Sequence, residues 1–181
     1  MDGKIIITAE DIREAGDYIP ITEKAALAQV LARACVLPIE IKDKNGLRFP
    51  GRTEENVLAK ERAVLGVFLS YYLHVKWENY KEDISAPVEL YDLYMSSGLF
   101  NQLERLKGNP ELRTKIFDIL ADYKCFCKML NTEIFSLIGH SNDTVARLYK
   151  AAAPLAGKGI DIICGLMESL PNGAEEAQGD K

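Results

Sequence analysis

The chain has 181 residues, of which 48% are hydrophobic and 27% charged, and its formal net charge is −5. These proportions are typical of a globular protein and exclude a collagen-like or largely disordered chain. No apolar run reaches the roughly 18 residues that a membrane-spanning helix needs. Lysine and arginine are not concentrated in either half, so the charge pattern does not indicate a nucleic-acid-binding protein.

The four cysteines form no recognisable disulfide or metal-binding framework. Cys35 and Cys164 are isolated, and Cys125 and Cys127 lie two residues apart in a helical pattern, which points them to different helix faces. The chain begins without the basic segment and apolar run of a secretory signal. We therefore expect free thiols, no cofactor and a cytoplasmic location.

The first 35 residues predict one strand and two helices. A β-branched run gives a short strand near residues 4–8, and a short helix follows that stops near Gly16. Thr22 is a candidate N-cap for a second helix, rich in alanine and leucine, that extends to Cys35. In this helix we expect Leu27, Leu31 and Ala34 to form the buried face and Lys24 to face water.

Residues 39–49 alternate apolar and polar side chains on both sides of an Asn-Gly pair, a pattern that predicts a β-hairpin. A two-residue loop would mix polar and apolar residues on each face. A three-residue loop of residues 44–46 instead sets Ile41 opposite Phe49, with Gly46 in the left-handed conformation. We expect the three-residue loop, and the N-terminal strand is a candidate third strand of this sheet.

From Thr53 onward the pattern is helical. Thr53 is a candidate N-cap, and residues 63–75 are apolar on nearly all sides. A helix that is hydrophobic all round is buried all round, so we expect a central helix of about residues 54–80. A further helix ends near Gly98, and a short one covers residues 99–106.

The clearest helix start is Asn109, because a proline and a glutamate follow it. Apolar residues then recur at alternating steps of four and three: Leu112, Ile116, Ile119, Tyr123, Phe126 and Leu130. Further apolar residues widen this seam, which favours packing within the chain over a coiled-coil dimer, and self-association through helix 110–130 stays open. The helix is expected to bend or break near residues 131–132, and residues 139–142 predict a turn.

Residues 160–170 predict a last amphipathic helix, and residues 171–181 a disordered acidic tail. No linker separates two parts of the chain. The predicted fold is therefore mainly α. It is a single domain, residues 1–170, in which a helical bundle surrounds the buried central helix and carries a small N-terminal β element.

No arrangement of residues indicates catalysis. The segment 153–159 misses the P-loop pattern at two of its four fixed positions. His74 and Glu78 share a helix face but would supply only two metal ligands. There is also no nucleophile elbow. We therefore expect no catalytic residue and no metal site.

Two groups of residues are candidates for binding. The basic group, Lys42, Lys44, Arg48 and Arg52, lies within eleven residues that hold a single acid. It fits phosphate groups or an acidic protein surface, or else a solvated face whose lysines protect an exposed edge strand. The aromatic group belongs to a run of seven rings between residues 71 and 100, from which Trp77, Tyr91 and Tyr94 are singled out. Such rings lie either at the edge of a core or on a protein-binding surface.

These observations favour a non-catalytic protein-interaction protein, an adaptor, regulator or assembly subunit that acts through helical and aromatic surfaces. Its partner would be another protein, a second copy included, and neither a membrane nor a nucleic acid is expected. Two alternatives stay open. One is an enzyme or small-ligand-binding protein with a pocket beside the central helix, and the other is contact with nucleic acid through the basic hairpin, residues 42–52.

Overall fold

The computed structural model describes residues 5–77 and 83–152 of the chain. Of these, 67% are helical, and the remainder includes a small antiparallel sheet of two strands. The elements in order are α1 (Ala9–Glu14), α2 (Ile21–Ala34), β1 (Val36–Lys42), β2 (Arg48–Glu55), α3 (Val57–Val67), the π-helical turn η1 (Phe68–Tyr72), α4 (Val88–Ser96), α5 (Leu99–Leu106) and α6 (Pro110–Ala152).

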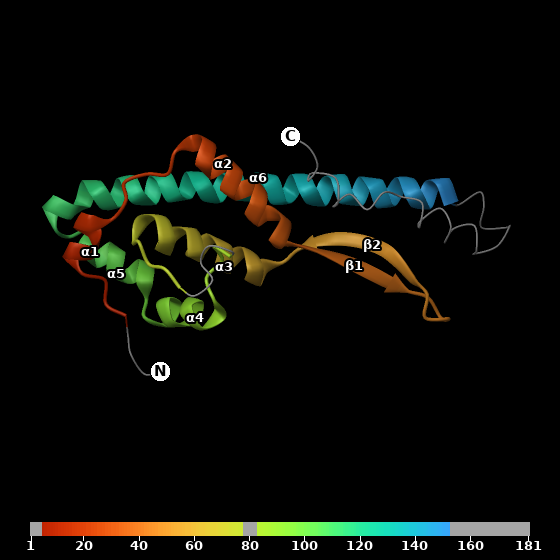
Figure 1. Ribbon diagram of the computed structural model, residues 1–181, viewed down its shortest axis with the longest axis horizontal. Helices are drawn as coiled ribbons and strands as arrows, with labels where there is room; N and C mark the ends of the chain where they lie inside the picture. The colour runs from red at the N-terminus through yellow and green to blue at the C-terminus, as the bar shows by residue number, and fades with distance from the viewer. Residues whose placement is uncertain (1–4, 78–82, 153–181) are drawn as a thin grey trace, which may run out of the picture.

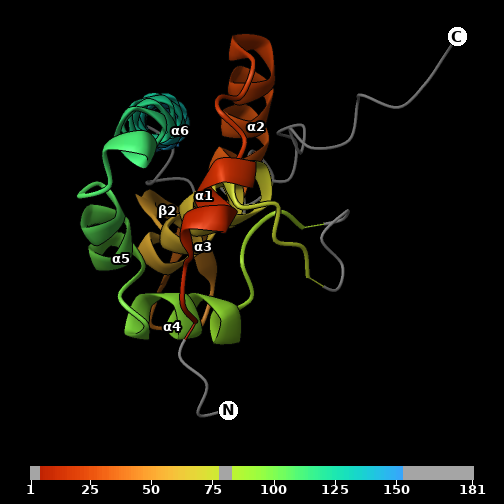
Figure 2. The same cartoon turned by 90° about the vertical axis from the view of Figure 1, so that its left-hand side faces the viewer.

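Helix α6 is the long axis of the molecule (Figure 1). Helices α1, α3 and α5 lie at its N-terminal half, α4 lies on the side of α3 away from it, and α2 crosses it diagonally. The β1–β2 hairpin runs beside its C-terminal half, away from the other helices. Figure 2 looks along α6 and shows α3 among the surrounding helices.

The predicted seam of α6 faces the core. Its six apolar side chains are all buried, and Ile134 extends the buried row by one more turn. They pack with α2 and with the rings of Phe68 and Tyr72. Because the seam is used within the chain, self-association, which stays a prediction, has to use another surface.

The predicted bend near residues 131–132 and the predicted turn at residues 139–142 are wrong, since α6 is one helix of 43 residues. Thr132 hydrogen-bonds its hydroxyl to the Lys128 carbonyl 3.0 Å away, one turn back in the same helix. Gly139 lies on an exposed face with free space around it. A glycine costs a helix about 1 kcal/mol, which is offset by the apolar packing before it and by the hydrogen bonds of Ser141 and Asn142 to Thr53 after it.

The strand expected near residues 4–8 is also not formed over its described part, residues 5–8. The Ile5 N–H donates to the Ser97 hydroxyl at 3.0 Å, and the Ile7 N–H donates to Oε1 of Gln102 at 2.7 Å. Gln102 in turn donates from Nε2 to the Ile5 carbonyl at 2.9 Å. The side chains of Gln102 on α5 and of Ser97, the residue after α4, thus satisfy backbone groups that a neighbouring strand would have paired.

The hairpin is longer than residues 39–49. Ile41 lies opposite Phe49, and the Asp43 N–H donates to the Leu47 carbonyl at 2.9 Å, which leaves residues 44–46 as the loop. Gly46 has the positive φ, 83°, that this loop requires. Thr53 lies inside β2, so it is not the N-cap that the sequence suggested.

The N-cap of α3 is instead Asn56, whose side chain accepts a hydrogen bond from the Ala59 N–H at 3.1 Å. From there α3 and η1 are continuous and end at Tyr72, not near residue 80. The Tyr72 carbonyl accepts from the Gly16 N–H at 2.9 Å, a tertiary bond that takes the place of a further helical turn. Most of the side chains from Ala63 to Tyr72 are buried, as expected of the predicted central helix.

The segment before α4 passes very close to the backbone of α3 at Gly66. A side chain at Gly66 would place its Cβ 1.9 Å from the Ile84 carbonyl oxygen, so only glycine lets the segment before α4 cross here. The crossing is fixed by Arg62, whose Nε donates to the Ala86 carbonyl at 2.6 Å.

Several predictions concern residues outside the described ranges: the helix at 160–170, the tail at 171–181, Cys164 and the segment 153–159. The domain limits stay predictions. Within the described ranges, no helix combines the length and the apolar character that crossing a membrane requires.

Candidate functional site

The hairpin is held against the last part of α6 by polar contacts. The Asn142 carboxamide accepts from the Thr53 N–H at 2.7 Å and donates to the Thr53 carbonyl at 3.4 Å, as a neighbouring strand would. The hydroxyls of Thr53 and Ser141 are 2.5 Å apart, and the Tyr149 hydroxyl donates to the Pro50 carbonyl at 3.0 Å. The outer edge of β2 is therefore fixed to α6. We call this region, residues 36–55 and 141–151, the hairpin end.

A cleft of about 270 Å³ lies within the hairpin end. Its walls are mostly apolar and come from both strands and α6: Pro38, Ile39, Glu40, Arg48, Phe49, Pro50, Gly51, Thr53, Ser141 and Val145. Small-molecule sites usually have 300–1,000 Å³, so this cleft suits a single side chain better than a substrate. Its two hydroxyls bond to each other and its walls hold no histidine or cysteine, so the lining offers no nucleophile with a base.

The four basic candidates all lie exposed on the hairpin, but two of them are neutralised locally. Arg48 forms an ion pair with Glu40 at 3.1 Å, and Arg52 pairs with Glu54. Lys42 lies opposite Arg48 across the strands. Lys42 and Lys44 have no ion pair within residues 5–77 and 83–152. The patch is thus smaller than the sequence suggested.

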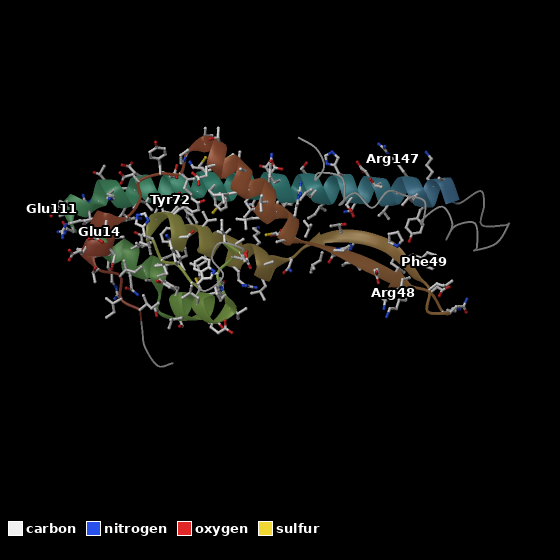
Figure 3. The ribbon with its side chains drawn as sticks, viewed as in Figure 1. Glu14, Arg48, Phe49, Tyr72, Glu111 and Arg147 are labelled. Atoms are coloured by element: carbon white, nitrogen blue, oxygen red, sulfur yellow. The ribbon has the colours of Figure 1, made fainter. Side chains whose placement is uncertain are left out.

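Helix α6 adds two cations that sequence reasoning missed. Arg147 and Lys150 are exposed on its last turns, and neither has an ion pair in the described part of the chain. Figure 3 shows Arg147 at the same end of the molecule as Arg48 and Phe49. These cations lie at the same end of the molecule as the hairpin because α6 is unbroken. The sequence pattern predicted a break in this helix, so their position could not be foreseen.

Large aliphatic side chains are exposed beside the cleft. Three of them lie on β1, Leu37 (48%), Ile39 (38%) and Ile41 (53%), and Leu47 (40%) lies directly after the loop. Their alternation with polar residues predicted a strand with one buried face. In the structure the hairpin contacts α6 mainly through β2, so these side chains of β1 stay in water. They are a surface that the sequence analysis did not single out.

The aromatic candidates lie at the edge of the core. Tyr94 is buried at 6% exposure, and Tyr91 and Trp77 are half-buried. The Trp77 indole N–H donates to the Asp83 carbonyl at 3.2 Å. The sequence analysis left open whether these rings lie at the edge of the core or on an exposed surface. In the structure they lie at the edge of the core and do not share an exposed face.

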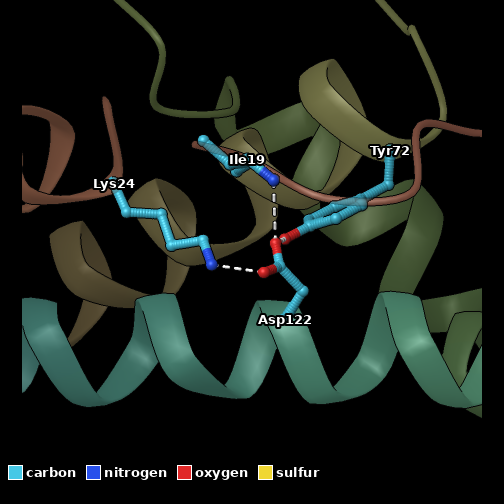
Figure 4. Close-up of polar contacts among 4 residues, drawn as sticks. All are labelled: Ile19, Lys24, Tyr72 and Asp122. Carbon is cyan, nitrogen blue, oxygen red and sulfur yellow. Dashed lines mark hydrogen bonds and ion pairs between the residues drawn. The ribbon is translucent and has the colours of Figure 1, made fainter. Parts of the chain in front are cut away.

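A buried charged group lies elsewhere, where α6 meets α2 and η1 (Figure 4). Oδ2 of Asp122 accepts from the Tyr72 hydroxyl at 2.6 Å and from the Ile19 N–H at 2.9 Å, while Oδ1 pairs with Lys24. Lys24, expected to face water, is only 5% exposed. No local pattern in the sequence indicates this contact, because Asp122 lies 98 residues further along the chain.

The environment of this group favours the ionised form of Asp122. Burial acts to raise the pKa of Asp122, but the bonds from Lys24, Tyr72 and Ile19 outweigh it and hold the pKa below its usual value. Burial, with the hydrogen bond to Asp122, raises the pKa of Tyr72. The hydrogen bonds of this group join four segments of the chain, so we assign it a role in stability.

Cys35 and Cys127 also lack the features of a nucleophile. Burial, reinforced by Glu55, raises the pKa of Cys35 to about 11, and burial raises the pKa of Cys127 to about 11. Both are therefore neutral thiols near pH 7. Among the residues that the structure describes, no three histidine, cysteine, aspartate or glutamate side chains are placed to share a metal ion.

Comparison of this chain with protein-family models, curated proteins and solved structures found no match. Its function has to be argued from its own surface.

Proposed function

We propose that this chain is a non-catalytic protein-interaction protein and that the hairpin end is its binding surface. The observation that carries the proposal is the set of four exposed aliphatic side chains on β1 and directly after the loop, next to a cleft with mostly apolar walls. Apolar side chains gathered on a surface are typical of interaction sites. A partner that covered them would remove them from water and gain about 25 cal/mol for each Å² of apolar surface buried.

The hairpin is suited to this role because it is held in place before binding. A two-stranded hairpin alone is marginal in water. Here the bonds from Asn142, Ser141 and Tyr149 fix β2 to α6. A surface with a fixed geometry loses less conformational entropy when it binds.

The side chains of the hairpin end, not the free edge of β1, form the proposed contact. Addition of a strand to β1 needs backbone donors along its outer edge. Pro38 in the middle of β1 has no N–H, and Lys42 follows at its end. Both are devices that protect an edge strand from pairing.

In this proposal the helices act as the scaffold. We infer that α1 to α5, with the first half of α6, form a bundle around α3 and η1. The burial of Val67, Phe68, Leu69 and Tyr72 and the position of α3 in Figure 2 support this arrangement. The two alternative functions have less support. The cleft lies at the hairpin and not beside the central helix, and half of the hairpin cations already pair with glutamates.

The test places a photo-crosslinking amino acid at Leu47 in the native host, with Val30 on α2 as the matched position. Val30 is also exposed, at 69%, but lies outside the hairpin end. We expect a defined protein adduct from position 47 and none from position 30. The purified partner should then bind Ile41→Asp at least about tenfold more weakly than the wild type, and Val30→Asp equally well.

The proposal is wrong if both positions give the same adducts, or if Ile41→Asp binds the purified partner as the wild type does. Circular dichroism of each variant checks that the fold is kept. Because Ile41 is half exposed and lies in a hairpin, loss of folding is not expected from this change.

A further inference from the structure

One face of the hairpin is apolar and open to water along β1. Leu37, Ile39 and Ile41 alternate along this strand, so they share a face of the sheet. Phe49 of β2 lies opposite Ile41 and shares the same face. We call these four side chains the apolar face. The three on β1 are 38% to 53% exposed, because α6 is bonded to the outer edge of β2 on the other side of the hairpin.

The cleft continues the apolar face towards α6. It lies between Ile39 and Phe49 on the sheet and Val145 on the helix, and its volume of about 270 Å³ suits one side chain. The row from Leu37 to Ile41 spans about 13 Å. A segment that covers the apolar face therefore needs one apolar side of about this length, and it can place a side chain in the cleft.

The chain holds a segment of this kind outside the described residues. We call residues 160–170, for which the sequence predicts an amphipathic helix, the C-terminal segment. Successive residues of a helix are turned by about 100°, so its apolar side chains gather on one side: Ile160, Ile163, Cys164, Leu166, Met167 and Leu170. Its polar residues fall on the other side: Asp161, Glu168 and Ser169. A helix of this length measures about 16 Å, which matches the row on β1.

The position at which α6 ends brings the C-terminal segment to the hairpin. Tyr149, three residues before the end of α6, donates to the carbonyl of Pro50, the neighbour of Phe49. Figure 1 shows the end of α6 and the loop of the hairpin at the same end of the molecule. The connection of residues 153–159 spans at most about 28 Å. The C-terminal segment can therefore begin beside the apolar face.

The same connection rules out exposed apolar side chains further along α6. Phe117 lies 35 residues before the end of the helix, which corresponds to about 52 Å. The connection and the C-terminal segment together reach about 44 Å from Ala152. Phe135, which is 66% exposed, is within reach but lies outside the apolar face, so it provides a control for the experiment.

We propose that the C-terminal segment packs as a helix on the apolar face of its own chain, with one of its apolar side chains in the cleft. The hairpin then lies between two helices, with α6 at its β2 edge and the C-terminal segment over β1. A partner of the hairpin end has to displace the C-terminal segment, which therefore controls access to this surface. The control of access rests on the proposed function, whereas the contact within the chain needs no partner.

Attachment to the same chain makes a weak contact sufficient. A short flexible connection gives an effective concentration in the millimolar range. A contact whose dissociation constant between separate molecules is about 0.1 mM is then formed about nine-tenths of the time. A partner binds such a chain about tenfold more weakly than an open one. The C-terminal segment thus covers the surface without preventing a partner from opening it.

The experiment detects the contact as a disulfide within the full chain. Cys125 and Cys127 are replaced by alanine, and Cys35 is kept because it is buried. The reactive native thiol is then Cys164 of the C-terminal segment. Ile39→Cys adds a second thiol at the middle of the row on β1. Since Cys164 is near the middle of its segment, the two thiols meet whichever way the helix runs along β1.

Two control positions separate docking from mere attachment. Lys42→Cys lies on the other face of the same strand, and Phe135→Cys lies on α6. Both positions are exposed and within reach of the connection. In oxidised glutathione we expect Ile39→Cys to form its disulfide with Cys164 at least about tenfold faster than either control does, at a rate that is independent of protein concentration. Mass spectrometry of proteolytic peptides identifies each disulfide.

Two pairs of substitutions test the apolar side of the C-terminal segment. Ile163→Asp with Met167→Asp, the apolar-side variant, should reduce the rate for Ile39→Cys to that of the controls. Gly165→Asp with Ser169→Asp, the polar-side variant, adds the same two charges to the other side and should leave the rate unchanged. The purified partner from the crosslinking experiment should bind the apolar-side variant about tenfold more tightly than the wild type, and the polar-side variant equally well. Circular dichroism checks the fold of each variant.

The inference is overturned if Ile39→Cys reacts no faster than the controls, or if the apolar-side variant reacts as fast as the polar-side variant. It is also overturned if the disulfide forms only between two chains, since the occupant would then be a second copy. A partner that binds the apolar-side variant no more tightly than the wild type refutes the control of access. Failure of the proposed function is a separate result, because a fast disulfide within the chain together with no partner at position 47 refutes the proposed function and keeps the contact.

Discussion

At the scale of single residues, Asp122 has the largest expected effect. Its carboxylate holds Lys24, Tyr72 and the backbone of Ile19 in an almost dry environment. Asp122→Asn leaves the buried ammonium of Lys24 without a counter-charge. We expect this change to lower the free energy of unfolding at neutral pH by about 3–5 kcal/mol, as is found when one partner of a buried ion pair is removed.

The pH dependence of this loss follows from the lowered pKa of Asp122. A carboxyl whose pKa is lower in the folded state stabilises the fold above its unfolded pKa of about 3.9, and this contribution disappears as the pH falls through the folded pKa. Urea unfolding should therefore give free energies of unfolding for the wild type and Asp122→Asn that differ widely at pH 7 and converge below about pH 4.

Asp118→Asn, one turn earlier and exposed, is the control and should change the free energy of unfolding by less than about 0.5 kcal/mol. If the difference in free energy of unfolding between the wild type and Asp122→Asn did not depend on pH, the ionised Asp122 carboxylate would not be the source of the stability.

The sequence did not reveal this group because a helical pattern locates a buried face only to within one position. The expected face of α2 contained Leu27, Leu31 and Ala34, whereas the buried residues are Lys24, Ala28, Leu31, Ala32 and, just after the helix, Cys35. A lysine in the buried row needs a partner, and only the three-dimensional structure shows where the partner lies.

At the scale of elements, the continuity of α6 predicts the effect of a change at Gly139. This glycine is helical and exposed, and an added Cβ would meet nothing within 4 Å. Gly139→Ala should therefore raise the free energy of unfolding by about 0.5–1 kcal/mol, because alanine favours the helix and restricts the unfolded chain. Denaturant unfolding followed by circular dichroism measures the change.

Gly66→Ala is the matched comparison. It is also a glycine in a helix, but its new Cβ would lie 1.9 Å from the Ile84 carbonyl oxygen. The same substitution should therefore destabilise the protein here, by more than the gain at Gly139. If Gly139→Ala also destabilised the protein, residues 139–142 would form the turn that the sequence suggested.

The elements that the sequence predicts well are those with local causes. Thr8 and Asp11 form a reciprocal capping box at α1, residues 44–46 form the hairpin loop, and Pro110 begins α6. The errors lie where distant groups compete with local signals. Ser141 and Asn142 cap no helix because they bond to Thr53, 88 and 89 residues away, and Gln102 satisfies the backbone of residues 5–7.

At the scale of the whole molecule, the same straight helix that carries the core also builds the candidate site. Lys42, Lys44, Arg48 and Arg52 could be predicted because they are close in sequence. The contribution of α6, from Ser141 to Lys150, could not, since it depends on a helix that continues for about five turns past its last fully buried residue, Ile134. The assignment of the hairpin end as a surface therefore depends on the length of α6.

This length can be measured with spin labels. Cysteines at Glu111 and Lys150, in a chain whose four native cysteines are replaced by alanine, should give a narrow distance distribution near about 58 Å, because 39 residues of helix rise about 1.5 Å each. Labels at Glu111 and Lys128 are the control and should lie about 26 Å apart, since both interpretations of the sequence make this part helical. Dilution with unlabelled protein removes distances between copies. A correct control distance together with a shorter, broad distribution for the long pair would show a break near residues 131–142, and the cations of α6 would then not lie at the hairpin.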